Sequence, residues 1–136
     1  MGQGKEYHIN NSTIKIIFGN ILESQADVIV NSSGSSMTMS DGLTKAIREA
    51  GGDVIREDAQ KKLPVIIGDT IVTTAGSLTQ KYVFHCITID KSSDHSNTPE
   101  GISNDDINQY IIGHSIDKCF LLLHALELKS IAFPSR

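Results

Sequence analysis

The segment 27–50 most constrains the fold of this chain. Residues 28–30, Val-Ile-Val, form an apolar β-branched run that is typical of a strand buried on both faces of a sheet. Small and polar residues follow from 31 to 40, and Leu43–Ala50 then has the composition of a helix that ends at Gly51. A strand that leads through a glycine-containing loop into a helix brings unpaired N–H groups and the positive end of a helix dipole to one place. This segment therefore predicts an anion site, for which phosphate is the usual ligand.

A second interpretation of this segment stays open at this point. Neither standard glycine fingerprint of nucleotide-binding loops, GxGxxG or GxxxxGK(S/T), occurs in it. An ordinary connection between a strand and a helix, with nothing bound, is also consistent with these residues.

Composition and charge exclude several classes of function. The formal net charge of −4 argues against a general nucleic-acid coat, because such binding depends on a basic surface. No apolar run approaches the roughly 20 residues that span a bilayer, and residues 1–6 are polar, unlike a signal peptide. Cys86 and Cys119 lie in apolar stretches and are expected to be small buried hydrophobes in a reducing compartment, not a disulfide framework or a metal site. We expect an intracellular protein, cytoplasmic or nuclear, with no membrane partner, metal or cofactor.

The rest of the chain alternates strands and helices. The expected strands are 7–10, 14–18, 70–74, 81–87 and 131–133, and the expected helices are 53–62 and a long one after residue 106 that follows a polar surface loop over 90–104. The long helix is expected to bury a face made of Ile112, Ile116, Cys119, Leu123 and Leu126. Because the strands are nearly continuously apolar, the pattern predicts an α/β sandwich with helices on both faces of the sheet, in a single domain over 1–136.

Several short stretches occur in an order and spacing that cover nearly the whole chain. They are Gly19-Asn20-Ile21, Ala26–Asn31, Gly42–Ile47, Gly68-Asp69-Thr70 with Thr73–Leu78, Val83-Phe84-His85 and Ile131–Pro134. In this order they resemble the motifs of the macro domain, a module that binds ADP-ribose. The resemblance implies a three-layer α/β/α sandwich around a mixed, largely parallel sheet. It also implies a ligand crevice at the C-terminal ends of the strands and ADP-ribose, free or attached to protein, as the ligand.

The resemblance assigns one corner of the site to the adenine. Gly19, Asn20 and Ile21 match the family's adenine corner, where the family has an aspartate at the position of Asn20. The amide oxygen of Asn20 can accept the same hydrogen bond without charge assistance, so we expect it to contact the adenine amino group. A simple turn residue is the alternative interpretation of Asn20.

The same resemblance assigns the ribose and the diphosphate. Asn31 would lie beside the distal ribose, with Ser32 and Ser33 in place of two alanines. Gly34 replaces an asparagine that family members place near that ribose. The pair Gly42-Leu43 corresponds to the glycine-rich loop whose backbone N–H groups hold the diphosphate.

The catalytic position of the family is altered in this chain. Thr44 stands where hydrolytic members of one large subgroup carry an aspartate that activates or orients water, and a hydroxyl is a poor general base near neutral pH. Asp41 is the nearby candidate replacement in the same crevice, and an aspartate of the loop or of the helix N-cap is its alternative role. His85 lies on an apolar strand and is expected to be a core histidine. No confident catalytic residue emerges.

Three functions are therefore compared. The first is binding of ADP-ribose or a related nucleotide diphosphate. The second is hydrolysis, either removing ADP-ribose from proteins or deacylating an ADP-ribose ester. The third is a degenerate domain that serves as a structural or interaction element.

The C-terminal end departs most from the family. The family continues past the stretch Ile131–Pro134 into a second glycine-rich loop and then a terminal helix, whereas this sequence ends at Arg136. A macro-like domain without that loop is expected to lack one wall of its crevice and to bind weakly. The open edge would also expose apolar surface and favour self-association.

Overall fold

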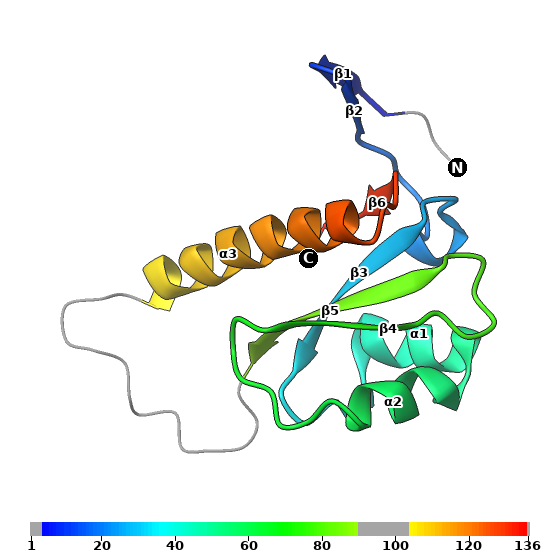
Figure 1. The fold of residues 1–136 in the computed structure, drawn as a ribbon, viewed down its shortest axis with the longest axis vertical. Coiled ribbons are helices and arrows are strands. Elements are labelled where there is room, and N and C mark those ends of the chain that lie inside the picture. Colours follow the sequence, from blue (N-terminus) through cyan, green and yellow to red (C-terminus); the bar gives the residue numbers. More distant parts are fainter. Residues whose placement is uncertain (1–3, 90–103, 136) are drawn as a thin grey trace.

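The computed structural model describes residues 4–89 and 104–135 and shows one four-stranded sheet beside a separate hairpin (Figure 1). The sheet has the strand order β4-β5-β3-β6. Its strands are β3 (Val28–Gly34), β4 (Thr70–Thr74), β5 (Tyr82–Ile89) and β6 (Ile131–Ala132). The central strand β3 is parallel to both β5 and β6, whereas β4 is antiparallel to β5. The sheet is therefore mixed and largely parallel, as predicted.

Helices cover both faces of this sheet. The helices are α1 (Gly42–Gly51), α2 (Asp53–Gln60) and α3 (Asn104–Ala125). Alternate residues of β3 face opposite layers, since Ile29 packs in one core with Ile47 and Ile55, and Val30 packs in another with Cys119. Figure 1 shows α1 and α2 together on one side and α3 on the other. The predicted three-layer α/β/α sandwich is confirmed.

The N-terminal strands do not join the main sheet. Strands β1 (Glu6–Ile9) and β2 (Ser12–Lys15) form an antiparallel hairpin around a two-residue turn. Asn10 in that turn has φ 54°, a conformation that asparagine tolerates better than most residues. The predictions of an edge strand over 7–10 and of a strand reaching Phe18 were therefore wrong in placement and in length. The hairpin supplies its own pairing partner, and every residue in both strands is exposed.

Strand β3 is longer than the sequence predicted. The expected loop began at Asn31, but the parallel ladder with β5 continues until Gly34 pairs with Ile89. The polar side chains of Asn31 and Ser33 are buried there. Pairing with a neighbouring strand has overridden the low strand propensity of these residues.

The face of α3 that packs on the sheet was predicted only in part, since Cys119 is buried and Leu123 packs against the core while the other predicted residues are exposed. Its buried positions are Ile111, Ser115 and Cys119, whereas Ile112, Ile116 and Leu126 are 54%, 38% and 40% exposed. Both rows have helical spacing and apolar members, so periodicity could not choose between them. Within the described residues no helix is both long and apolar enough to cross a bilayer.

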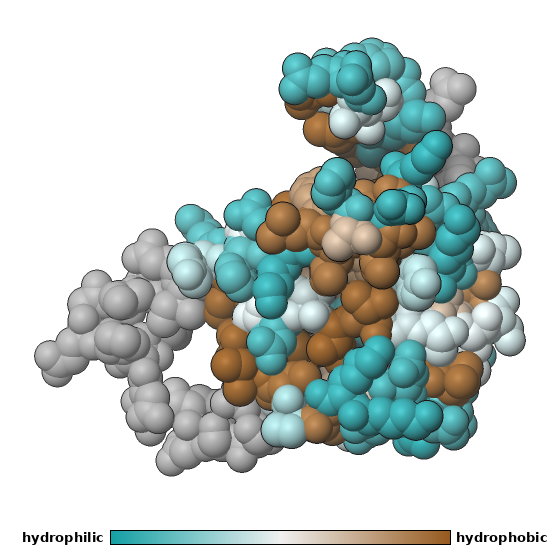
Figure 2. Space-filling model, viewed as in Figure 1, coloured by the Kyte–Doolittle hydropathy of each residue, from teal (hydrophilic) through white to brown (hydrophobic). Residues whose placement is uncertain are grey.

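Apolar side chains stay exposed around α3 and β6. Phe120, Leu121 and Phe133 are among them, and Figure 2 shows hydrophobic residues gathered on the face that carries α3. Self-association through this region stays a prediction. The expected polar loop over 90–104 lies almost wholly outside the described residues, apart from Asn104 at the start of α3.

Asp27 joins the starts of three strands. Its carboxylate accepts a hydrogen bond from Lys129 N at 2.9 Å, and its backbone N–H donates to Ser130 Oγ at 2.8 Å just before β6. Its carbonyl oxygen accepts from Lys81 N at 2.7 Å just before β5. The Lys129 hydrogen bond, aided by the Lys81 ammonium, lowers the pKa of Asp27 below its usual 3.8.

Replacing Asp27 with Asn should destabilise the protein by about 1 kcal/mol at neutral pH, because the hydrogen bond from Lys129 loses its charge assistance. A lowered folded pKa stabilises the protein above the unfolded pKa, and this stabilisation is lost as pH falls through the folded value. Urea unfolding of both proteins should therefore give free energies that begin to approach each other near pH ~4 and converge once the pH is below the lowered pKa of Asp27. Asp53→Asn, at a mostly exposed partner of Arg48, is the control and should change little. A gap that persists at low pH would contradict this account.

Candidate functional site

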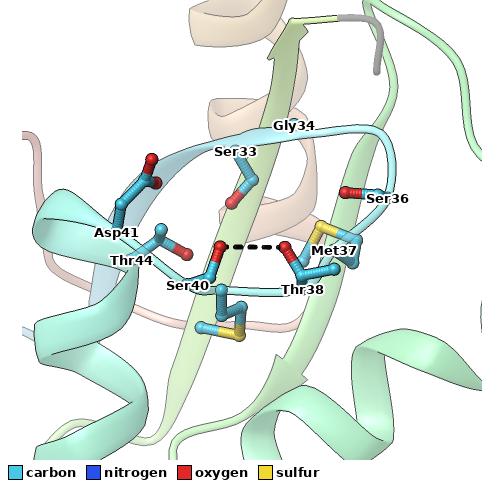
Figure 3. A pocket seen from close by; sticks show the side chains of 9 residues that line it. Ser33, Gly34, Ser36, Met37, Thr38, Ser40, Asp41 and Thr44 are labelled. Carbon is cyan, nitrogen blue, oxygen red and sulfur yellow. Dashed lines mark hydrogen bonds between the residues drawn. The ribbon is translucent and has the colours of Figure 1, made fainter. Parts of the chain in front are cut away.

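A small hollow lies where β3 ends and α1 begins (Figure 3). Its volume is about 30 Å³, room for little more than a water molecule. Hydroxyl groups from the strand, the loop and the helix turn toward it in Figure 3. The lining residues are Ser33, Gly34, Ser36, Met37, Thr38, Met39, Ser40, Asp41 and Thr44.

Core packing and hydrogen bonds from α1 and α2 fix the loop that rims the hollow. Met37 and Met39 have positive φ values of 51° and 54°, yet both side chains are buried in the core between the sheet and α1. Gln60 of α2 donates to Met37 O at 2.7 Å, and Arg48 of α1 donates to Thr38 O at 3.3 Å. Since left-handed backbone is costly for side-chain-bearing residues, packing and these hydrogen bonds maintain the loop conformation.

Asn31 does not line the hollow but contacts two residues that do, Ser33 and Thr44. The two N–H groups of Asn31 Nδ2 are shared among three acceptors within reach, which are Ser33 Oγ at 2.7 Å, Thr44 Oγ1 at 3.1 Å and His85 Nδ1 at 3.1 Å. Its other carboxamide atom, Oδ1, is buried and finds no hydrogen-bond partner among the described residues. The carboxamide therefore fixes a strand hydroxyl and a helix hydroxyl while keeping one unused acceptor.

His85 completes this network on the side away from the hollow. Its Nδ1 lies 3.1 Å from Asn31 Nδ2, and its Nε2 lies 2.8 Å from Thr73 Oγ1. Thr73 Oγ1 in turn donates to Thr74 O. Burial, with a smaller contribution from the Lys62 ammonium, lowers the pKa of His85 to about 3. The ring is thus neutral near pH 7 and bonded at both nitrogens, which confirms the prediction of a core histidine.

The start of α1 is open to solvent. Asp41 occupies the N-cap position, but within the described chain its side chain makes no capping hydrogen bond. Gly42 has φ +61°, and a Cβ built on it would meet no described atom within 4 Å. The N–H groups of the first turn therefore point toward accessible space, with the positive end of the helix dipole behind them. Anion binding at this helix start stays a prediction.

The structure brings together one part of the predicted site. Ser33, Gly34, Asp41 and Thr44 line the hollow, Asn31 contacts two of these residues, and the pair Gly42-Leu43 begins the adjoining helix. Sequence reasoning did not assign the lining residues at 36–40. Their signal was their place in the small-residue loop between a buried strand and a helix.

Other predicted residues lie away from the hollow. Ser32 points to the opposite face of the sheet, where its Oγ lies 2.6 Å from Thr88 Oγ1. Asn20 accepts a hydrogen bond from Leu22 N and caps the short 3₁₀ helix Ile21–Glu23. Gln80, which lies just before β5, donates a hydrogen bond to Leu22 O in this helix. The adenine contact of Gly19-Asn20-Ile21 stays a prediction.

The site offers hydroxyl groups and backbone N–H groups, which bind anions rather than metal ions. In the part of the chain that is described, no three His, Cys, Asp or Glu side chains gather closely enough to hold a metal ion. Neutral donors around a helix start suit an anionic oxygen-rich ligand.

Comparison with known proteins decides the family. The sequence model of the macro domain matches residues 30–135. The chain belongs to the macro domain family. A macro domain-containing protein of Caldanaerobacter subterraneus is 33% identical over 127 residues, covering 90% of this chain and 66% of that protein. A protein of Aeropyrum pernix is 32% identical over 87 residues, covering 64% of this chain and 46% of that protein. This macro domain chain thus spans about half to two thirds of the length of these curated relatives.

Solved macrodomains share its fold. A mutant of the Oceanobacillus iheyensis macrodomain superposes with a TM-score of 0.80 at 22% identity, covering 99% of this chain and 70% of that one. The Trypanosoma brucei macrodomain in complex with ADP-ribose gives a TM-score of 0.66 at 21% identity, covering 85% of this chain and 43% of that one. At such identities the likeness establishes the fold.

The buried His85 should make stability fall as the solution is acidified. Because its pKa is near 6.5 when unfolded and about 3 when folded, the unfolded chain binds a proton that the folded chain excludes. The free energy of unfolding should drop by about 1 kcal/mol between pH ~7.5 and pH ~5.5 from this group. Denaturant unfolding should show that His85→Gln removes this drop, whereas His124→Gln, at an exposed position, keeps it. An unchanged drop in His85→Gln would contradict the assignment.

Proposed function

We propose that this macro domain binds ADP-ribose, free or attached to protein, with the diphosphate at the start of α1. Family membership supports the ligand class, since the related Trypanosoma brucei structure is a complex with ADP-ribose and a mutant Oceanobacillus iheyensis macrodomain is described with ADPR. The site chemistry supports the placement, because hydroxyl groups and first-turn N–H groups converge there.

The observation that carries the proposal is the open backbone at Gly42. Its φ of +61° and the empty space beside its Cα allow a phosphate to approach the main chain closely. Asp41 leaves the first-turn N–H groups without a side-chain cap, so an incoming anion would meet donors that the protein has not already used.

The size of the hollow bears on the affinity. Ligand pockets usually enclose about 300–1,000 Å³, whereas this hollow encloses about 30 Å³. The described chain by itself would therefore cover a small part of a dinucleotide-sized ligand, and we expect weak binding. The carboxylate of Asp41 beside the hollow also opposes a second anion.

Replacing Gly42 with Val should weaken ADP-ribose binding about tenfold or more, because a β-branched side chain would occupy the space that the phosphate needs. Calorimetric titration of the wild-type chain and the variant measures this. Gly52→Ala is the matched control, since Gly52 also has a positive φ of +101° and free space but caps the other end of the same helix. Gly52→Ala should lose stability and keep its affinity.

Two outcomes would overturn the placement or the function. Equal affinity of the wild-type chain and of folded Gly42→Val would remove α1 from the site. A wild-type chain that shows no heat of binding at millimolar ligand would favour a structural or interaction role instead.

A hydrolase is the second candidate, and Asp41 is the observation that favours it. Its exposed carboxylate makes no capping bond in the described structure, so it is free to orient a water molecule near the hollow. Against this, Thr44 offers only a hydroxyl that already accepts from Asn31, and Gly34 offers no side chain.

Turnover of mono-ADP-ribosylated protein should stay near the uncatalysed background. General-base assistance is typically worth about 10²–10⁴-fold, and the position matched to the family's base is the neutral Thr44. Release of ADP-ribose over time, followed by chromatography, measures the rate for the wild-type chain and for Asp41→Asn. Steady release that disappears in Asp41→Asn, with Thr44→Ser as an active control, would replace binding alone with hydrolysis.

A further inference from the structure

The helix α3 packs on the sheet with a row of buried side chains and with the partly buried Leu122 and Leu123. Ile111, Ser115 and Cys119 are buried, whereas Ile112 and Ile116 beside them are exposed. Cys119 sits in this row directly against β5, where Cys86 is the neighbouring residue. The two sulfur atoms lie 3.6 Å apart.

Both thiols are free and enclosed, but they are not equivalent. Cys86 is 5% exposed and Cys119 is 0% exposed, so a small reagent has its access through Cys86. The Cys86 sulfur also accepts a hydrogen bond from Thr70 Oγ1 at 3.8 Å. The Cys119 thiol, hydrogen-bonded to Cys86, holds the pKa of Cys86 to about 7, while the same pairing and burial raise the pKa of Cys119. Cys86 is therefore the more accessible cysteine of the pair and the one whose ionisation is favoured.

We propose that Cys86 and Cys119 form a reversible redox site, in which a small peroxide converts the facing thiols into a disulfide that fastens α3 to β5. This inference does not depend on ADP-ribose binding. The sulfur atoms must approach from 3.6 Å to a bond length of about 2.0 Å, which requires a modest shift of the helix or of the two side chains.

The reaction proceeds in two displacements that balance. The Cys86 thiolate attacks one peroxide oxygen, so an S–O bond forms, the O–O bond breaks and hydroxide leaves. The Cys119 sulfur then attacks the sulfur of this sulfenic acid, so the S–S bond forms, the S–O bond breaks and the Cys119 proton leaves with the second hydroxide as water. The first hydroxide takes up the proton that Cys86 released when it ionised, which gives the other water. In sum, two thiols and one hydrogen peroxide give one disulfide and two waters, and two electrons pass from sulfur to oxygen.

The position of this bond gives it a structural effect. It would close the chain between residues 86 and 119 and so restrict the unfolded state. Cys86 directly follows His85 and pairs in register with Ser32 of β3. A disulfide would thus tie α3 to the strand that supports Asn31 and the hollow.

The test uses the wild-type chain, reduced and then treated with a slight excess of hydrogen peroxide. Intact mass and thiol titration should show the loss of both thiols and of about 2 Da, without any added oxygen on cysteine. A non-reducing peptide map should contain one cross-linked pair joining the peptides of Cys86 and Cys119, and it separates this change from methionine oxidation. The oxidised form should melt about 10 °C higher than the reduced form, and dithiothreitol should reverse the shift.

Two single-cysteine variants test the separate roles of Cys86 and Cys119. Cys119→Ala should trap oxygen adducts on Cys86, and Cys86→Ala should leave Cys119 unreacted because it is fully enclosed. Two wild-type results would overturn the proposal without any variant: thiols that survive peroxide in the native protein, or disulfides that join two chains instead of residues 86 and 119. Either result would make the pair simple core packing.

Discussion

The parallel pairing of β3 with β5 is the constraint on which the rest of the structure depends. It runs without interruption from Val28 against Tyr82 to Ser33 against Ile87, and alternate side chains of both strands enter two different cores. The same ladder carries polar residues into the interior at its C-terminal end. The hollow forms because β3 stays paired with β5 beyond the apolar residues 28–30, and the chain leaves the sheet only after that and leads into α1.

Buried polar residues at this end are tolerated because they bond to one another. Asn31, His85 and Thr73 form a chain of neutral donors and acceptors that crosses from β3 through β5 to β4. A charged imidazole at this depth would be strongly desolvated, so the network works only with neutral histidine. Asn31 Oδ1 is buried and has no hydrogen-bond partner among the described residues.

The two faces of the sheet differ in how completely their apolar side chains are covered. On the α1 and α2 side, the loop over 35–40 is fixed by buried methionines and by Gln60, and the proposed anion site is held rigidly. On the α3 side, apolar side chains such as Phe120 remain exposed and the helix rests on a buried row that includes Cys119. The proposed disulfide would strengthen this less complete side of the sandwich.

The sequence by itself determined the layer architecture and the strand-loop-helix segment, because these follow from local periodicity, β-branching and glycine placement. Tertiary structure decided how far β3 extends, which row of α3 is buried, and that the hairpin over 6–15 stands apart from the sheet. Each of these depends on which partner a segment finds in space. The apolar rows through Ile111 and Ile112 are alike along the chain, and only the sheet distinguishes them. The strand register, likewise, placed Ser33 in the hollow and Ser32 on the opposite face.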